Sequence, residues 1–304
     1  MRLGVDLGGT KIEAAVLDTQ GAIVWRERVP TPNTHYQDVL QAIAALLNRA
    51  TLANALPADL PVGIGTPGSR SPVTGRMRNC NSTRLNDQLL LEDLQHTLQR
   101  PVRIANDADC FTLSEAVAGA ARGARTVFGV ILGTGVGGGI TVDGKLLAGP
   151  NGIAGEWGHN PMPGVSVQGR ALRKCLCGRD NCVETWLCGP ALQRSFAENA
   201  NENLTVQEWL TRSKSGDRYA QDVLHDFMAL LAQALSTVIN ILDPDVIVLG
   251  GGVSNITEIY QHVPRIWAPW IFSNVIRTRL VKAECGDSSG VIGAAWLWPE
   301  GQQP

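Results

Sequence analysis

The stretch LGVDLGGTKIEAAVL, residues 3–17, places two apolar runs on either side of a glycine-rich turn. Leu3–Leu7 and Ile12–Leu17 have the length and composition of β-strands, and Gly8–Thr10 between them has the residues of a tight turn. A third run, Ala22–Arg26, follows a second turn at Asp18–Gly21. Short strands separated by turn residues predict an antiparallel meander at the start of the chain.

The same pattern returns near residue 127. Val127–Leu132 predicts a strand, Gly133–Gly139 a glycine loop and Ile140–Val142 a second strand. The pair Asp143-Gly144 is typical of a hairpin turn, after which Lys145–Ala148 returns. Each half of the chain therefore begins with the same order of predicted elements, which indicates an internal duplication. The two segments share this pattern more than they share residue identities.

Apolar periodicity predicts the remaining elements. Helices are expected at residues 36–52, 90–98, 218–242 and 288–298, and strands at Val62–Gly65, Val102–Ala105 and Asp245–Leu249. The length of 304 residues suggests two domains rather than one.

Charge and cysteine content exclude several classes of protein. The net charge of −2 gives no reason to expect nucleic acid or an anionic membrane as partner. The start of the chain has no apolar signal segment, and the most apolar runs, such as Val246–Leu249, are too short to span a bilayer, so we expect a cytoplasmic protein. The odd number of cysteines, seven, argues against a disulfide framework.

Three glycine-rich turns follow apolar strands: Gly8–Lys11, Gly133–Gly139 and Gly250–Gly252. Glycine lets a phosphate approach backbone N–H groups closely. None of the turns is a Walker A motif, and a single Gly-Gly turn is more often a plain hairpin. Three of them together predict a nucleotide site in which the first two hold phosphates and the third, with Gly250 and Gly251, lies under adenosine. Asp6 could hold Mg²⁺ through water.

Asp107 follows the predicted strand Val102–Ala105 as part of an Asn106-Asp107 pair. The plain alternative is that either residue caps the next helix. Beside a nucleotide site, however, a carboxylate at the carboxyl end of a strand is placed to accept a proton from a substrate hydroxyl. Phosphoryl transfer needs mainly positioning and charge stabilisation, so an ordinary carboxylate suffices.

One histidine and three cysteines, His159, Cys175, Cys177 and Cys182, form a potential tetrahedral zinc set. With no open position the zinc would be structural; the alternative is unrelated free thiols. Glu156 and Glu184 flank the cluster. Glutamates are usually solvated, but carboxylates and imidazole can also form paired hydrogen bonds with the closely spaced hydroxyls of a sugar. His159 could bind the metal with one ring nitrogen and a sugar hydroxyl with the other.

Several motifs together resemble the ROK family (repressor, open reading frame, kinase). They are DLGGTK at 6–11, ND at 106–107, GTGVGGG at 133–139, GEWGH at 155–159 and CLCGRDNCVE at 175–184, and the resemblance covers essentially the whole chain. One departure is Asn181, where the family usually has glycine. This changes a turn residue and spares every proposed ligand, because asparagine tolerates left-handed geometry.

The resemblance implies an actin-like, hexokinase-type (ribonuclease H-like) α/β fold, with an ATP cleft between a domain of residues 1–122 plus 291–304 and a domain of residues 123–290. The last helix would pack back on the first domain, and the protein would form homodimers. Asp107 would be the general base, and Asn106, Glu156, His159 and Glu184 would contact the sugar. ATP would lie against Gly4, Val5, Asp6, Leu7, Gly8, Gly9, Thr10, Lys11, Gly133, Thr134, Gly135, Val136, Gly137, Gly138, Gly139 and Ile140.

A finer resemblance is to the bacterial fructokinases of the family, which also phosphorylate mannose. It rests on GTPGS at 65–69, NCNST at 79–83, LN at 85–86, NGIAG at 151–155, HNP at 159–161 and GDSSG at 286–290. It implies conversion of fructose to fructose 6-phosphate, with Asn81 near the sugar. The alternatives within the family are kinases of N-acetylglucosamine, N-acetylmannosamine or glucose.

Three other classes of protein compete with a kinase. Repressors of the family carry a helix-turn-helix before the glycine turn, whereas here a strand is predicted from Leu3. A sugar sensor without catalysis would not need Asp107. A zinc-dependent hydrolase needs an open metal position, which a set of one imidazole and three thiolates does not leave.

Overall fold

The computed structural model describes residues 1–164, 171–200, 202 and 204–299, and divides the chain into two compact units. Unit 1 comprises residues 1–123, 139–154 and 284–304, and unit 2 comprises residues 124–138 and 155–283. The chain therefore passes between the units at 123/124, 138/139, 154/155 and 283/284. The domain boundaries predicted from the sequence, at 122/123 and 290/291, stay a prediction. They place residues 139–154 in the second domain, whereas the structure groups these residues with unit 1.

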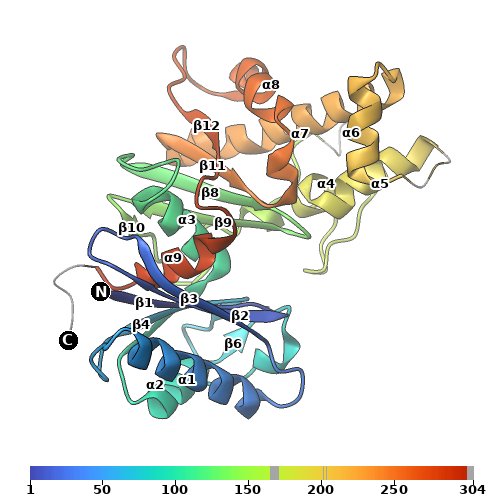
Figure 1. The fold of residues 1–304 in the computed structure, drawn as a ribbon. Coiled ribbons are helices and arrows are strands. Elements are labelled where there is room, and N and C mark those ends of the chain that lie inside the picture. The colour runs from blue at the N-terminus through green and yellow to red at the C-terminus, as the bar shows by residue number, and fades with distance from the viewer. Residues whose placement is uncertain (165–170, 201, 203, 300–304) are drawn as a thin grey trace. The chain divides into compact units, whose positions relative to one another are not determined.

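The sheet of unit 1 has the strand order β3-β2-β1-β4-β7 (Figure 1). Its central strands are buried because helices cover both faces: α1 and α2 lie on one face and α9 on the other. The pairs β1–β4 and β4–β7 are parallel, whereas β1–β2 and β2–β3 form the expected antiparallel meander. The elements are β1 (Arg2–Leu7), β2 (Lys11–Leu17), β3 (Ile23–Pro30), α1 (Tyr36–Ala53), β4 (Val62–Thr66), α2 (Leu90–Leu98), β7 (Val102–Asn106) and α3 (Asp107–Val117).

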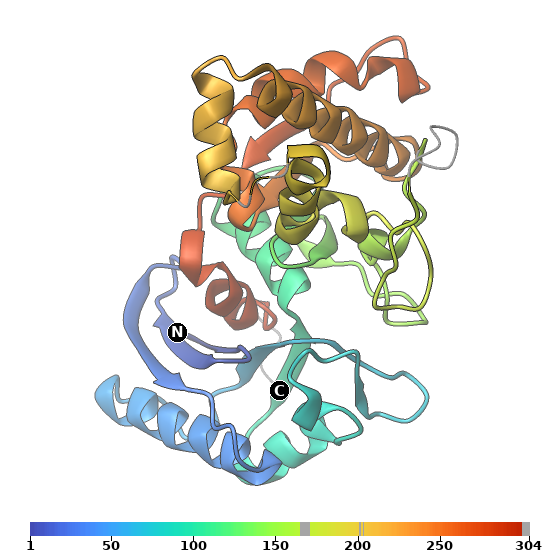
Figure 2. The same ribbon diagram turned by 90° about the vertical axis from the view of Figure 1, so that its right-hand side faces the viewer.

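The last helix, α9 (Ser289–Ala295), packs against β1, β4 and α3 within unit 1, as the resemblance implied. In Figure 2 this red helix lies beside the blue N-terminal strands. Gly4 and Gly63 allow the contact, because a Cβ atom on either would collide with the backbone of α9. The helix is shorter than the predicted range 288–298 and ends at Ala295.

The second sheet repeats the strand order of the first, as β10-β9-β8-β11-β12. Its strands are β8 (Thr126–Leu132), β9 (Val136–Val142), β10 (Lys145–Leu146), β11 (Val246–Gly250) and β12 (Arg279–Lys282). Strand β9 begins at Val136 rather than at the predicted Ile140. The glycines of its first half serve close packing and not a turn, since a Cβ atom on Gly138 would collide with the carbonyl oxygen of Gly155.

Helices make up most of unit 2 outside its strands, whereas β10 and residues 139–142 of β9 are grouped with unit 1. They are α4 (Glu184–Leu187), α5 (Gly189–Ala200), α6 (Val206–Lys214), α7 (Arg218–Leu242) and α8 (Glu258–Ile266). Among the residues with described positions, α7 alone is long and apolar enough to cross a membrane, which the sequence analysis overlooked. The most apolar window of α7 is 61% buried, because α6, α8 and the α4–α5 segment pack against it. It is the core helix of its unit.

The short elements lie mainly in loops. A two-stranded hairpin, β5 (Ser69–Arg70) and β6 (Met77–Arg78), belongs to unit 1. Single turns of 3₁₀ helix are found at Thr83–Leu85, Trp157–His159, Gly252–Asn255, Ala268–Trp270 and Gly286–Ser288.

Candidate functional site

Asp107 is the first residue of α3 and directly follows β7. The helix is capped mainly by Asn106, whose Oδ1 accepts a hydrogen bond from the N–H of Ala108 at 2.8 Å and whose Nδ2 donates to the carbonyl of Gly68 at 3.2 Å. Asp107 Oδ1 also accepts from that N–H, at 2.8 Å. The carboxylate is exposed, and the helix N-terminus favours its ionised form. Its position suits a group that takes a proton from a ligand.

Asp6 lies near Asp107 within unit 1, at the carboxyl end of β1. Burial, and then the charges of Asp107 and Glu13, raise the pKa of the Asp6 carboxyl from 3.8 to about 6, while Lys11 and Arg28 act in the opposite direction. A Cβ atom on Gly290 would lie 2.7 Å from Asp6 Oδ2. Two neighbouring carboxylates with one partly desolvated form a place that attracts a hard cation.

The turn Gly8–Lys11 closes as a tight hairpin, with the N–H of Gly8 donating to the carbonyl of Lys11 at 2.9 Å. Thr31, the residue after β3, holds this hairpin in place with two hydrogen bonds. The hydroxyl of Thr31 donates to the carbonyl of Gly8 at 2.8 Å, and the N–H of Thr31 donates to the carbonyl of Thr10 at 3.0 Å. The side chains of Thr10 and Lys11 are exposed. The hairpin therefore presents its tip to solvent on a rigid base, as a phosphate-binding turn requires.

The second glycine turn, Gly133–Gly135, is held by Glu184 within unit 2. Glu184 Oε2 accepts from the N–H of Val136 at 3.0 Å, and a Cβ atom on Gly135 would lie 2.6 Å from the same oxygen. Glu184 Oε1 accepts from Cys175 Sγ at 3.8 Å. In this structure Glu184 therefore links the glycine turn to the cysteine cluster, a role that its position after Cys182 did not indicate.

Gly250 and Gly251 follow β11, which pairs in parallel with β8 so that Gly250 lies opposite Ile131. Gly251 has a φ of 82°, and a Cβ atom there would collide with the carbonyl of Leu132. The structure thus brings the second and third glycine turns together at the carboxyl ends of adjacent strands. This is the edge at which α/β sheets bind ligands.

Glu156 and His159 belong to one turn that the 3₁₀ helix Trp157–His159 forms. The Glu156 side chain is exposed, and the Trp157 indole anchors the turn by donating to the carbonyl of Gly137 at 3.2 Å. In unit 1, Asn81 is exposed on a loop closed by Asn86, which bonds both the N–H and the carbonyl of Cys80. Glu156 and Asn81 are therefore free to meet a ligand, each in its own unit.

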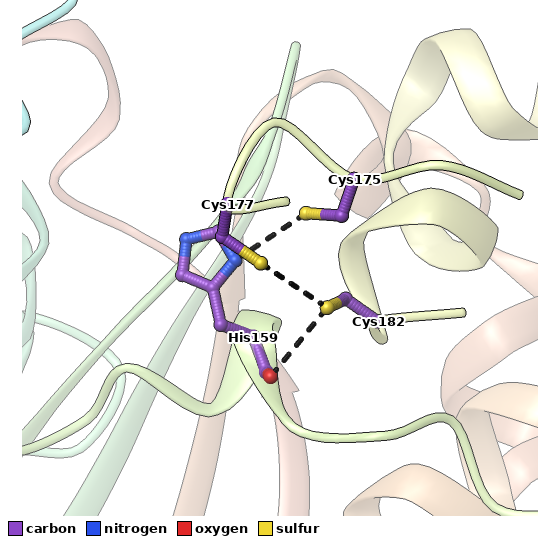
Figure 3. A group of neighbouring side chains, drawn as sticks. All are labelled: His159, Cys175, Cys177 and Cys182. Atoms are coloured by element: carbon purple, nitrogen blue, oxygen red, sulfur yellow. Dashed lines mark hydrogen bonds between the residues drawn. The ribbon is translucent and has the colours of Figure 1, made fainter. Parts of the chain in front are cut away.

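The ligand atoms of His159, Cys175, Cys177 and Cys182 all lie within 4.8 Å of one another. Figure 3 shows the three thiols and one ring nitrogen of His159 facing a common point. Cys175 Sγ is 3.5 Å from His159 Nδ1, and Cys177 Sγ is 3.5 Å from Cys182 Sγ. Ligand atoms of a tetrahedral zinc ion are about 3.8 Å apart, so the residues fit that metal.

The surroundings of the cluster act differently on its thiols and close the loop that carries them. A hydrogen bond from Arg179 lowers the pKa of Cys177 to about 6, which favours the thiolate that a metal ion binds, whereas burial raises the pKa of Cys182. Asn181, at the position where the ROK family usually has glycine, has a positive φ of 53°, which asparagine tolerates. Its Oδ1 accepts from the N–H of Arg173 at 2.9 Å and closes the loop.

The candidate residues thus form two groups. Asp6 to Lys11, Asn81, Asn106 and Asp107 are in unit 1, with Gly139 and Ile140; Gly133 to Gly138, Glu156, His159, Glu184, the three thiols, Gly250 and Gly251 are in unit 2. Gly4, Val5 and Leu7 lie within β1 and are not in the turn itself.

The sequence profile of the ROK family matches residues 2–301. The chain belongs to the ROK family. Among curated relatives, the N-acetyl-D-glucosamine kinase of Pectobacterium atrosepticum is 38% identical over 301 residues, covering 98% of each chain. The ROK hexokinase of Thermus thermophilus superposes with a TM-score of 0.85 at 30% identity, covering 97% of this chain and 96% of that one. The ROK glucokinase of Streptomyces griseus in complex with glucose and AMPPNP superposes with a TM-score of 0.73 at 27% identity, covering 97% and 98%.

The family match and the similarity to these two solved structures confirm the predicted hexokinase-type α/β fold. They also support sugar-kinase activity over the whole chain and not over one unit alone. The finer expectation of a fructokinase is not confirmed, because the curated relatives compared with this chain include kinases of N-acetyl-D-glucosamine and, in Shewanella, of N-acetylgalactosamine.

Proposed function

We propose that this ROK chain is an ATP-dependent sugar kinase with N-acetyl-D-glucosamine as its first candidate substrate. The observation that carries the proposal is the exposed Asp107 carboxylate at the β7–α3 junction, close to a second carboxylate, Asp6, and in the same unit as the phosphate-binding hairpin. The likeness over 98% of the chain to a kinase of that sugar supports the same reaction class.

In the proposed reaction Asp107 accepts the proton of a sugar hydroxyl as the oxygen attacks the γ-phosphorus of ATP. The new sugar O–P bond forms, the bond to the β-phosphate oxygen breaks, and ADP leaves. Asn106 keeps the carboxylate in place, because it caps α3 and ties the cap to Gly68. Positioning of this kind supplies most of the catalysis in phosphoryl transfer.

The ATP phosphates would lie on the N–H groups of the Gly8–Lys11 and Gly133–Gly135 turns, and the adenosine near Gly250 and Gly251. Asp6 would hold Mg²⁺ through water, and the raised pKa of Asp6 fits a site that is completed by a cation. When bound, the ion would neutralise charge on the phosphates.

The residues that would contact the sugar are Asn81, Asn106, Glu156 and His159. His159 turns Nδ1 toward the thiols, so its other ring nitrogen points away from them, as Figure 3 shows. A zinc ion on Nδ1 would fix the ring so that this second nitrogen can meet a sugar hydroxyl. Glu184 would act mainly as a brace of the glycine turn.

Fructose, with mannose, is the second candidate. The residues that favour it are the loop sequences GTPGS at 65–69 and NCNST at 79–83, which resemble those of bacterial fructokinases. A coupled ADP-release assay with fructose, mannose, glucose, N-acetylglucosamine, N-acetylmannosamine and allose separates the candidates. A preference for N-acetylglucosamine in kcat/KM supports the first, and a preference for fructose replaces it while leaving the kinase mechanism intact.

The mechanism is tested by Asp107→Asn. We expect sugar-dependent ADP release to fall by at least a thousandfold while the sugar still binds, because the amide keeps the shape of the side chain but cannot accept the proton. Asp59→Asn, a change of an exposed aspartate, is the control and should leave turnover unchanged. Near-normal turnover of Asp107→Asn would refute the role of this residue.

A further inference from the structure

Glu13 is a fully buried carboxylate in β2 that no step above uses. In the sheet of unit 1 it lies directly opposite Asp6 of β1 on one side and Arg28 of β3 on the other. Residues opposite each other in a sheet project from the same face, with Cβ atoms about 4.5–5.5 Å apart. Asp6, Glu13 and Arg28 therefore form a row of three charged side chains across the sheet, which we call the charge row.

The charge row is covered by the beginning of α9. A Cβ atom on Gly290 would lie 2.7 Å from Asp6 Oδ2, and Arg26, which lies beside the row, donates to the hydroxyl of Ser288 at 2.7 Å. This cover keeps water from Glu13, so the charge of Glu13 has to be balanced by a neighbouring cation.

The arginines of β3 supply that balance unequally. Arg28 Nε donates to Glu13 Oε2 at 2.5 Å, whereas Arg26 Nε lies 3.7 Å from Glu13 Oε1, outside hydrogen-bond distance. Glu13 Oε1 accepts no hydrogen bond from any residue that the structure describes. Arg28 is therefore the main partner of Glu13, and the pair fixes the guanidinium of Arg28 at the middle of the charge row.

Arg28 also lies within electrostatic range of the carboxylate at the end of the row. The hydrogen bond with Glu13 raises the pKa of Arg28, and the charges of Asp287 and Asp6 act in the same direction. Neighbouring strands are about 4.8 Å apart, so Arg28 stands about 10 Å from Asp6 along the row. Because 35% of the Arg28 side chain is exposed, it has room to move, and its length can close this gap when nothing between the two holds it. An arginine bonded to Asp6 would compete with a cation for that carboxylate.

We propose that Glu13 is a positioning residue that holds Arg28 away from Asp6, so that the Asp6 carboxylate stays available to a hydrated divalent cation. The proposal rests on the proposed function in that it assigns the magnesium ion to Asp6. Glu13 itself meets neither the ion nor a substrate. It acts through Arg28, whose charge it neutralises within the charge row.

The first test measures how strongly Mg²⁺ supports nucleotide binding. Calorimetric titration gives the Kd of AMPPNP in EDTA and in Mg²⁺, and the ratio of the first to the second is the metal dependence. We expect Glu13→Gln to lower the metal dependence at least fivefold, because the released Arg28 then pairs with Asp6. Adding Arg28→Gln to Glu13→Gln should restore it to within twofold of wild type, which the loss of a merely structural residue would not allow.

Two single variants are the controls. Arg28→Gln breaks the same ion pair but removes the competitor of the cation, so it should not lower the metal dependence. This variant keeps the proposal testable even where Glu13→Gln alone does not fold. Glu27→Gln removes a carboxylate of β3 that pairs with Arg49 of α1 at 2.9 Å on the other face of the sheet, and it should leave the metal dependence unchanged.

A second measurement uses neither metal nor nucleotide. Urea unfolding in EDTA at pH 7.5 gives the effect of Asp6→Asn on the unfolding midpoint. In wild type the substitution should raise the midpoint, because it removes a partly desolvated charge. In Glu13→Gln it should lower the midpoint, because it removes the new partner of Arg28 and leaves that charge unpaired.

The outcomes separate the two proposals. Wild-type metal dependence in Asp6→Asn would refute the magnesium role of Asp6, and the unfolding midpoints would still decide whether Glu13 keeps Arg28 from Asp6. Where Asp6→Asn does abolish the metal dependence, a Glu13→Gln protein that keeps it, or an equal loss in Glu13→Gln and Arg28→Gln, would overturn the role of Glu13. A midpoint that Asp6→Asn raises equally in both backgrounds would also overturn it and leave the ion pair as a structural one.

Discussion

The ionised carboxylate of Asp6, near the proposed general base Asp107, destabilises the folded state. Burial and the nearby Asp107 raise the pKa of its carboxyl from 3.8 to about 6, so the folded state binds this proton more tightly than the unfolded state does. The stabilisation from that proton is complete below pH 4 and is lost as the pH rises through 6. Active sites often contain such strained groups.

We predict that Asp6→Asn raises the free energy of unfolding at pH 7.5 by about 2 kcal/mol relative to wild type, with no gain at pH 4, while kinase activity is lost. Urea unfolding monitored at both pH values gives the two differences. Asp59→Asn, at an exposed position, is the matched control and should leave the pH dependence unchanged. Parallel stability profiles of Asp6→Asn and wild type would contradict the assignment.

The position of Asp107 could be predicted from the sequence, whereas the contacts of Glu115 could not. The Asn-Asp pair after an apolar strand is a local signal, and the structure places Asp107 at the predicted strand end. Glu115 has no local signal, because a glutamate inside a helix is usually solvated. Glu115 is buried because it accepts hydrogen bonds from the N–H groups of Glu284 and Cys285, whose distance in sequence hides the contact.

At the scale of elements, the β8–β9 hairpin depends on glycine for packing. We predict that Gly138→Ala weakens ATP binding by at least tenfold and lowers stability by about 1–3 kcal/mol, because the new Cβ would meet the carbonyl of Gly155 at 2.6 Å and the Trp157 ring at 2.7 Å. Calorimetric titration with AMPPNP and urea unfolding measure the two effects. Gly149→Ala, with open space around it, should change neither. Wild-type affinity in Gly138→Ala would show that this turn does not shape the ATP site.

The His159–cysteine loop is a second element whose order comes from side chains rather than from regular hydrogen bonding. We predict about one zinc per chain in purified protein by metal analysis. Cys182→Ser should lose the metal and weaken sugar binding by at least tenfold, because the His159 ring is then no longer fixed. Cys188→Ser, a buried cysteine outside the cluster, is the matched control and should keep its zinc. A zinc-free protein with full sugar affinity would show that the cluster does not support the sugar site.

Elements with their own periodicity were predicted closely. The helix at 218–242 and the strand at residues 127–132 agree with α7 and β8 to within a residue. The start of β9 was missed by four residues, because a run of glycines reads as a turn when its neighbours are unknown. Only the positions of Trp157 and the Gly155 carbonyl explain why small residues are needed in that strand.

At the scale of the molecule, two sheets with the same strand order bear out the repeated opening pattern of the sequence. The pattern could not show that residues 139–154 associate with the first unit, because that depends on contacts such as Arg78 Nη2 donating to the carbonyl of Asn151 at 2.6 Å. Individual strands can be predicted from local hydrophobic patterns, whereas their order in the sheets and the assignment of a segment to a unit depend on long-range contacts.

Each unit has its own core, so we predict that they unfold in separable steps. Leu46→Ala in α1 and Leu231→Ala in α7 each remove a fully buried side chain and should each lower stability by about 2–5 kcal/mol. Scanning calorimetry should show that Leu46→Ala lowers one transition and Leu231→Ala the other, since the denaturation of multidomain proteins need not be two-state. Leu52→Ala, on the exposed face of α1, is the control and should move neither. A single transition lowered equally by both buried substitutions would mean that the four links couple the units into one cooperative body.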